Sequence, residues 1–203
     1  MMKKMLWIAC LLLSVLAVEA QSLKKVDEAQ ARAMIEKINS TAATIKTMDC
    51  QFTQVKTLRF LDDKMTSTGR MLYDAAGKLR WEYQQPYQYT FILNGQKVYI
   101  KSQKNLQTID IRQSRLFQGI VEVMMNSVTG RGLTTGGDFS CTMYTQGDEW
   151  VARLVPQRKE MKRLFKTVSL HFSSQKQMVT QVEMTEQSGD ATVITLKNMK
   201  TNG

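Results

Sequence analysis

Few side chains in this sequence belong to the types that perform catalysis. His171 is the sole histidine, and a serine or cysteine triad needs a histidine as its general base. No nucleophile motif lies near it, and the alternation around it predicts an exposed position on the polar face of a late strand. Asp62 with Asp63, or Glu82 with Glu183, offer carboxylate pairs of the kind that glycosidases use, but their positions favour roles in a turn and on strand faces. Phosphate-binding loops and clusters of metal ligands are absent from the sequence, so we expect no catalysis, no metal and no cofactor.

The N-terminus has the features of an export signal. Two lysines in the first five residues precede an apolar run at residues 6–18, and residues 18–20 suit a signal peptidase. The run of about 13 residues is shorter than the roughly 20 that a membrane anchor needs. We therefore expect residues 1–20 to be a signal peptide, cleaved after Ala20, and residues 21–203 to form a single domain.

Two cysteines remain after this cleavage, Cys50 and Cys141, each within a strand-like run. Outside the cytoplasm they could form one disulfide, and two buried thiols are the alternative. The chain has no Cys-x-x-Cys pair, which argues against thiol exchange and against a structural zinc site.

The expected mature chain is strongly basic, with 26 lysines and arginines against 17 aspartates and glutamates. Such a balance favours anionic lipid surfaces, acidic proteins or nucleic acid as partners. The densest basic run, residues 158–163, follows Pro156 in what we predict to be an exposed loop. This loop is either simply solvated or a docking surface for a partner or a membrane. Because no aromatic residues interleave with the charges and the chain is exported, we expect no nucleic acid partner.

The clearest strand pattern is the alternation of Leu79, Trp81 and Tyr83 with charged residues, which predicts one apolar and one solvated face. Asn94-Gly95 separates two such runs further along the chain. This dipeptide tolerates the positive φ that a type I′ turn requires at both central residues. The segment therefore predicts an antiparallel hairpin with Asn94 and Gly95 at its tip.

Two segments, residues 27–46 and 114–129, have helical periodicity. Asp27 with Gln30 resembles a capping box at the start of the first helix. The second helix has an unusually broad apolar face, one row of which is Leu116, Ile120, Met124 and Val128. Such a helix either packs on a filled core or covers the mouth of an apolar cavity.

Period-two alternation returns after Gly136-Gly137 and gives five further strand candidates, between residues 139 and 199, with short turns between them. Five or six strands precede the second helix. We therefore predict a mainly β (α+β) fold, an unclosed antiparallel half-barrel of about ten strands covered by two or three helices.

The order of these features resembles the LolA family of periplasmic outer-membrane lipoprotein carriers. The segments that carry the resemblance are Phe52-Thr53-Gln54, Gly69, Arg80-Trp81-Glu82-Tyr83, Gln85-Pro86 and Asn94-Gly95. The resemblance implies a half-barrel that holds the acyl chains of a lipoprotein and carries them from the inner to the outer membrane. It also implies a lid held by an arginine of an Arg-Pro pair, where this chain has Ala75-Ala76.

From this resemblance and the apolar patterns we predict a lipid-binding site formed by the sheet and the second helix. Its residues are Met71, Leu79, Trp81, Tyr83, Phe91 and Leu93 on the sheet, and Leu116, Ile120, Met124 and Val128 on the helix. The implied partners are acylated lipoproteins or lipids, an inner-membrane lipoprotein-releasing transporter, and an outer-membrane acceptor or membrane surface. We expect a monomer. The alternatives are a carrier or acceptor for another lipid or hydrophobic precursor, and a non-catalytic envelope interaction protein with a filled core.

Overall fold

The computed structural model describes residues 22–203, except residues 62, 103, 114 and 135–137. In this part of the chain, twelve strands form one sheet, accompanied by three α-helices and one 3-10 turn. The elements in chain order are β1 (Lys24–Lys25), α1 (Glu28–Thr44), β2 (Thr47–Leu58), β3 (Asp63–Asp74), β4 (Lys78–Gln85), β5 (Tyr89–Asn94), β6 (Lys97–Ser102), β7 (Leu106–Asp110), η1 (Ile111–Gln113), α2 (Arg115–Thr129), β8 (Phe139–Gln146), β9 (Glu149–Pro156), α3 (Lys159–Leu164), β10 (Phe165–Ser173), β11 (Val179–Glu186) and β12 (Ala191–Thr201).

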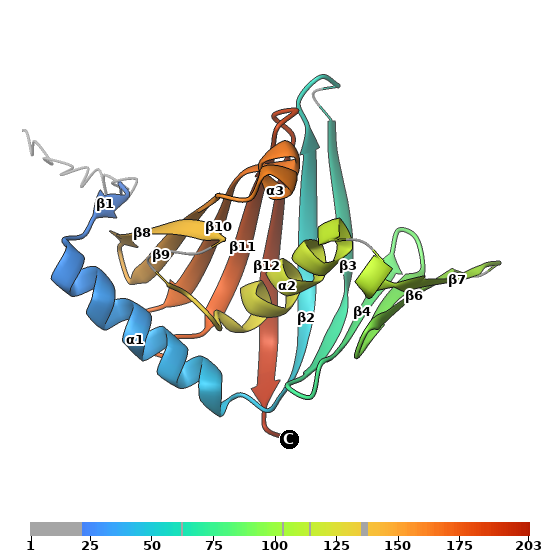
Figure 1. Ribbon diagram of the computed structural model, residues 1–203, viewed down its shortest axis with the longest axis horizontal. Coiled ribbons are helices and arrows are strands. Elements are labelled where there is room, and N and C mark those ends of the chain that lie inside the picture. Colours follow the sequence, from blue (N-terminus) through green and yellow to red (C-terminus); the bar gives the residue numbers. More distant parts are fainter. Residues whose placement is uncertain (1–21, 62, 103, 114, 135–137) are drawn as a thin grey trace, which may run out of the picture.

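The sheet has the order β1-β8-β9-β10-β11-β12-β2-β3-β4-β5-β6-β7, and each neighbouring pair is antiparallel. Its two edges, β1 and β7, are not paired with each other. Figure 1 shows the sheet curving around α2, with α1 along its lower end and α3 at its upper end. The predicted unclosed half-barrel is thus confirmed. Among the strands that the prediction missed is β1, whose two residues are too few to show a period.

Helix α1 begins where its capping residue predicts. The Asp27 side chain accepts a hydrogen bond of 2.8 Å from the backbone N–H of Gln30, which satisfies one of the free amides at the helix start. The buried residues recur at helical spacing and are Met34, Ile35, Ile38 and Ala42. They join a core that includes the apolar row of β10, formed by Val168, Leu170 and Phe172. One part of the core therefore lies between α1 and the later strands, and the core continues along β2, β3 and β4 through Phe52, Met71 and Leu79.

Helix α2 ends at a glycine that no other residue could replace without rearrangement. Gly130 has a φ of +73°, and its N–H donates to the carbonyl oxygen of Asn126 at 2.7 Å. A Cβ at this position would lie 2.4 Å from Cε1 of Phe172. The glycine therefore both stops the helix and lets its end pack against the sheet.

The β5–β6 hairpin exists, but its predicted turn is wrong by one residue. Asn94 is the last residue of β5 and pairs with Lys97, so the central residues are Gly95 and Gln96. Gly95 has a φ of +60°, and Gln96 is not among the described residues with positive φ. This geometry fits a type II′ turn, which requires glycine only at its first central position, and not the predicted type I′.

The basic run at residues 158–163 is not the predicted loop, because it forms most of the short helix α3. Met161 is buried at 3% exposure and fixes the helix to the core. Glu160 lies in the first turn, and Lys162 and Arg163 lie in the last. The acidic residue at the start and the basic residues at the end match the helix dipole and favour a helix here. The sequence prediction treated the segment only as a basic run and overlooked this preference.

None of the helices formed by the described residues has both the length and the apolar character required to cross a membrane.

Candidate functional site

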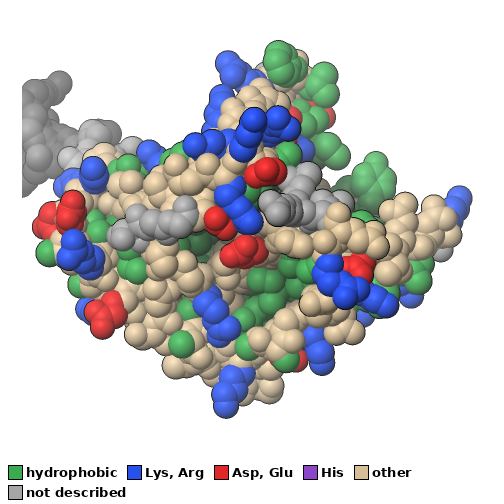
Figure 2. Space-filling view, viewed as in Figure 1, with side chains coloured by type: hydrophobic (Ala, Val, Ile, Leu, Met, Phe, Trp, Pro, Cys, Tyr) green, Lys and Arg blue, Asp and Glu red, His purple; other side chains and the backbone are tan. Residues whose placement is uncertain are grey.

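Helix α2 lies across the concave face of the sheet and encloses a cavity of about 330 Å³ on one of its flanks. The opposite wall of the cavity comes from β2, β4, β11 and β12. Most of the lining is apolar: Trp81, Tyr83, Ile120, Val123, Met124, Val128, Phe165, Val182, Met184 and Ile194. The polar lining residues are Gln54, Lys56, Ser127, Glu186 and Thr192. Figure 2 shows apolar side chains in the hollow on this face of the molecule.

An aromatic cluster forms one side of this cavity. The ring centroids of Phe52 and Trp81 are 4.7 Å apart, and those of Phe52 and Tyr83 are 5.1 Å apart with nearly perpendicular planes. Tyr83 also stacks on Tyr89 at 4.3 Å and donates its hydroxyl hydrogen to Oε1 of Gln54 at 2.9 Å. Such tilted and stacked pairs add stability beyond the area they bury, so the aromatic contacts help to hold this wall together.

Gly69 makes room for this cluster. A Cβ at Gly69 would lie 1.9 Å from the carbonyl oxygen of Glu82 and 2.6 Å from Cζ of Phe52. The pairing of β3 with β4 shifts register between Thr68 and Gly69. The bare backbone of Gly69 thus leaves room for the Phe52 ring against β3.

Two polar groups of the aromatic wall differ in their partners. Burial, followed by the neighbouring Tyr89, raises the pKa of Tyr83, which keeps its hydroxyl neutral. Trp81 is 5% exposed, and its indole N–H lies near the Tyr83 hydroxyl, where it acts to lower the pKa of Tyr83, without reaching the geometry of a hydrogen bond. A buried donor without a well-formed hydrogen bond is unfavourable, so a bound acceptor would compete with the Tyr83 hydroxyl for the N–H of Trp81.

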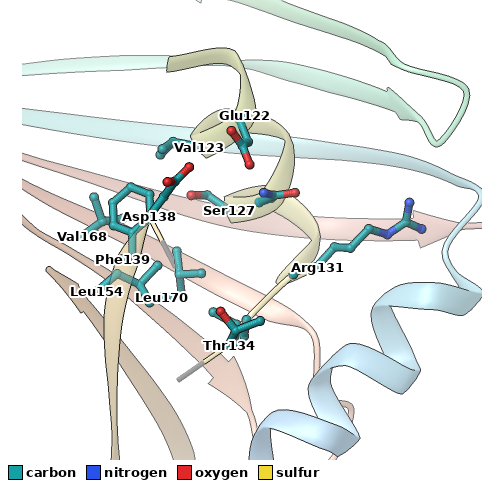
Figure 3. Close-up of a pocket in the computed structure, with 13 residues that line it drawn as sticks. Glu122, Val123, Ser127, Arg131, Thr134, Asp138, Phe139, Leu154, Val168 and Leu170 are labelled. Atoms are coloured by element: carbon teal, nitrogen blue, oxygen red, sulfur yellow. The ribbon is translucent and has the colours of Figure 1, made fainter. Parts of the chain in front are cut away.

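A second pocket of about 200 Å³ lies on the other flank of α2. Val123 and Ser127 line both pockets. In Figure 3, Leu154, Val168 and Leu170 from the sheet face these residues across the pocket. The concave face is therefore incompletely filled on both sides of α2.

The structure places five of the ten predicted lipid-binding residues in the lining of the larger cavity: Trp81, Tyr83, Ile120, Met124 and Val128. Met71, Leu79 and Leu93 are instead core residues, exposed by 0%, 1% and 3%. Phe91 is half-buried and packs against the core without lining the cavity. The side chain of Leu116 lies outside the described part of the structure. The strand residues that line the cavity lie in the half of each strand nearest α3. Period-two alternation shows which face of a strand a residue is on, but not which half of the strand lies at the cavity.

The sequence profile of the family described as "Outer membrane lipoprotein carrier protein LolA" matches residues 43–203. This match spans most of the chain. The chain belongs to the LolA family. No curated protein matches it.

Solved structures with a similar fold are distant in sequence. A LolA superfamily protein from Nitrosomonas europaea is 11% identical, with a TM-score of 0.44 over 85% of this chain and 94% of that one. The lipoprotein LppX of Mycobacterium tuberculosis is 10% identical, with a TM-score of 0.49 over 85% of this chain and 96% of that one. MucB in the Pseudomonas aeruginosa MucA/MucB complex is 8% identical, with a TM-score of 0.49, and the match covers 86% of this chain and 58% of that one.

The sequence prediction missed the cavity residues that this LolA family chain contributes from its last strands. Val182, Met184 and Ile194 are three of the ten apolar lining residues. The alternation of Val182 and Met184 with polar residues marked them as apolar-face residues. Nothing in the sequence showed that β12 lies between β11 and β2, which requires the long-range pairing of β12 with β2 that begins at Ala191 and Thr57.

In this LolA family chain an arginine ties the end of α2 to α1. Nη2 of Arg131 donates to the carbonyl oxygens of Ala42 at 3.1 Å and Ile45 at 3.4 Å. Figure 3 shows Arg131 extending away from the second pocket. The amide of Asn39 adds two reciprocal bonds with the backbone of Leu133, at 2.8 and 3.2 Å. These contacts fix the segment that follows α2 to α1.

His171 is buried, and the prediction of an exposed strand position was wrong. It is 6% exposed and lies between two carboxylates on the face of the sheet opposite the cavity, with Nδ1 3.2 Å from Glu149 and Nε2 3.4 Å from Glu183. Burial lowers the pKa of His171, but the contacts with both glutamates outweigh it and raise that pKa. The outward-pointing side chains of β9 and β11 thus cover a residue that alternation assigned to solvent.

The other candidates for chemistry have structural partners. The pair of Glu82 with Glu183 does not form, because Glu82 contacts Arg80 at 2.6 Å on β4 while Glu183 lies on β11. Asp62 lies outside the described residues. Cys50 and Cys141 are both free, and burial raises the pKa of their thiols to about 12 and about 11, so both are poor nucleophiles. Within residues 22–203, gaps excluded, no group of histidine, cysteine or acidic side chains could hold a metal ion.

Proposed function

We propose that this protein is a periplasmic carrier that binds the acyl chains of lipoproteins between α2 and the sheet and carries them from the inner to the outer membrane. The observation that carries the proposal is the apolar cavity of about 330 Å³ under α2. Membership of the LolA family supports it. A protein with a filled core, such as a purely structural envelope protein, would have no reason to leave both flanks of α2 open.

The energetics of acyl chains explain why a cavity is required. Moving a chain of about 15 methylenes through water costs on the order of 12 kcal/mol, at roughly 0.8 kcal/mol per group. A cavity lined by side chains such as Ile120, Val182 and Ile194 removes this penalty. Met124 and Met184 add unbranched thioethers, which adapt to acyl chains of different length and unsaturation.

Two features of the cavity restrict its cargo. The indole N–H of Trp81, which makes no well-formed hydrogen bond and lies near the Tyr83 hydroxyl, suits a ligand with a carbonyl acceptor, and an acyl ester or amide has one whereas a plain hydrocarbon has none. The volume of about 330 Å³ lies at the lower end of the roughly 300–1,000 Å³ typical of ligand pockets. A cargo with several acyl chains therefore requires α2 to move away from the sheet.

The remaining parts of the proposal concern the chain as a whole. Residues 1–20 act as the signal peptide, residues 21–203 are the carrier domain, and the protein works as a monomer without catalysis. It receives cargo from an inner-membrane lipoprotein-releasing transporter and passes it to an outer-membrane acceptor or membrane surface. A carrier of another lipid or hydrophobic precursor is the second candidate, because the cavity lining does not distinguish one apolar chain from another.

The test is mass spectrometry of lipids and acylated proteins that copurify with the exported protein. We expect acylated cargo in the purified protein and uptake of a fluorescent fatty acid by the delipidated protein. Ile120→Glu should weaken this uptake at least about tenfold, because it places a charge in the apolar cavity. Gln118→Glu is the matched control, since Gln118 is exposed on the same helix and does not line the cavity.

The outcomes separate the candidates. Another lipid class in place of acylated protein would favour the second candidate. An empty protein that takes up no fatty acid, or equal uptake by both variants, would contradict the carrier function.

A further inference from the structure

The most exposed large apolar side chain that the structure describes, Phe60, lies at the turn between β2 and β3 beside a second exposed apolar residue, Leu61. Phe60 is 87% exposed and Leu61 is 71% exposed, and Met65 on the same hairpin is 47% exposed. Figure 1 shows this hairpin extending beyond the neighbouring strands at the upper end of the sheet. Two adjacent large apolar residues at a projecting turn stabilise no part of this chain, so they point to an external partner.

The basic helix α3 lies at the same end of the molecule. Residues 158–166 contain five basic side chains and one acidic side chain. The β11–β12 turn joins the two features, because Asp190 accepts from the backbone N–H of Arg59 at 3.0 Å and the Gln187 amide donates to the carbonyl oxygen of Lys162 at 2.6 Å. Figure 2 shows lysine and arginine side chains around α3 next to the apolar tip of the hairpin. Exposed apolar residues and positive charge thus form one continuous surface.

The larger cavity reaches this same end. Lys56 and Glu186 form an ion pair of 3.2 Å in its lining, and Lys56 is four residues before Phe60. Phe165, another lining residue, follows α3 directly. Helix α2 touches α3 here, since a Cβ on Gly119 would lie 3.0 Å from Sδ of Met161. The polar rim of the cavity is therefore adjacent to the exposed surface.

We propose that this end of the protein docks on a membrane that contains anionic lipids. Phe60 and Leu61 enter the interfacial region of the bilayer, while Lys159, Lys162, Arg163 and Lys166 lie against the headgroups. The pairing of apolar and basic side chains fits a lipid surface, because the interior accepts apolar groups and anionic headgroups attract the charge. A groove for a protein partner is not needed to explain two side chains that project from a turn.

This inference rests on the proposed function in one respect only: docking would serve to bring the rim of the cavity to the membrane that receives the cargo. The docking itself depends on the surface and not on the cavity. The two proposals therefore make separate predictions, and either can fail without the other.

The test is flotation of the exported, purified protein with protein-free vesicles of phosphatidylcholine, with and without phosphatidylglycerol. We expect binding to the anionic vesicles, weakening as salt concentration rises. Phe60→Ser and Leu61→Ser should each reduce the partition coefficient about tenfold, because burial of a large apolar side chain is lost. Leu106→Ser is the matched control for Leu61→Ser, since Leu106 is 65% exposed on the edge strand β7, and it should bind as the wild type does.

A second pair of variants tests the charge. Lys162→Gln/Arg163→Gln and Lys101→Gln/Lys104→Gln each remove two positive charges, and all four side chains are exposed. Only the first pair should weaken binding to anionic vesicles. Equal loss in both pairs would show that net charge alone drives binding and would overturn the assignment of this surface.

Two other results would also overturn it. One is binding to vesicles that is indifferent to Phe60→Ser and Leu61→Ser. The other is an effect of these variants only when a protein acceptor is present, which would identify the surface as a protein interface. Fatty acid uptake measured without vesicles reports on the cavity alone, so loss of docking with normal uptake leaves the carrier function intact.

Discussion

The contact of Arg131 with the end of α1 leads to a quantitative prediction for Arg131→Gln. The wild-type guanidinium donates to two carbonyl oxygens, at 3.1 and 3.4 Å, and hydrogen bonds to charged groups contribute about 1.5–3 kcal/mol. The longer bond is weak, and the long side chain loses rotamer freedom. The positive charge at a helix C-terminus adds about 0.3–1 kcal/mol. We therefore expect a loss of about 2 kcal/mol in the free energy of unfolding, measured in urea, and a fall of about 4–8 °C in Tm.

Arg131→Gln should also loosen the attachment of α2, which acts as the lid of the cavity in the proposed function. Because only Gly130 separates Arg131 from the end of α2, loss of the Arg131 bonds leaves that end of α2 attached to α1 mainly through Asn39 and Leu133. Uptake of a fluorescent fatty acid should become faster, as measured by stopped-flow fluorescence. The control is Arg32→Gln, since Arg32 is 76% exposed and pairs only with Glu28 at 3.5 Å, a contact worth about 0.3–0.5 kcal/mol. Equal stability of the two variants, or a stability loss without faster uptake, would refute the role of Arg131 as a fixation point of the lid.

Two further predictions concern the sheet itself. Gly69→Ala should destabilise the protein by more than the roughly 1–3 kcal/mol typical of overpacking. The new Cβ would lie 1.9 Å from a backbone oxygen and 2.6 Å from the Phe52 ring. A urea midpoint equal to that of the wild type would contradict the close approach of β3 and β4. His171→Gln should cost more stability at pH 6 than at pH 9. The pKa of His171 is raised above the ordinary 6.5 in the folded protein, so the charged imidazole stabilises the fold below pH 6.5, and this stabilisation is lost as the pH rises through the raised pKa. The pKa of Glu183 is lowered from 4.5, which keeps that partner charged. An equal loss at both pH values, measured by urea unfolding, would show that Glu149 and Glu183 do not stabilise the charged imidazole.

The fold could be predicted because local patterns carry it. Alternation in β4 and β10 and the capping aspartate of α1 each depend on residues close in sequence, and all three elements form where predicted. Errors arose where a distant residue decides the outcome. His171 is buried because Glu149 and Glu183 come from the two adjacent strands, and no pattern within β10 contains that information.

The binding site was predictable only in part for the same reason. Trp81 and Leu79 have the same alternation in β4, yet Trp81 lines the cavity while Leu79 is core. The difference depends on where α2 crosses the sheet, which the sequence of β4 does not determine. The solvent exposure of Phe60 and Leu61 could likewise not be predicted from the sequence, which indicates only a turn in this region. Their exposure depends on how far β2 and β3 extend past the neighbouring strands.

The position of the lid contacts has a consequence for how the cavity would open. The end of α2 next to Arg131 is fixed to α1 through several hydrogen bonds, whereas the part near Gly119 packs against the apolar side chain of Met161 on α3. A rotation of α2 about its fixed end would therefore widen the cavity most beside α3, where Lys56 and Glu186 line it. That is also the end that carries Phe60 and the basic residues of α3, so a cargo leaving by the widest opening would emerge next to the proposed membrane-binding surface. Restricting this rotation, for example by a disulfide between α2 and α3, should therefore block loading and release while leaving vesicle binding unchanged.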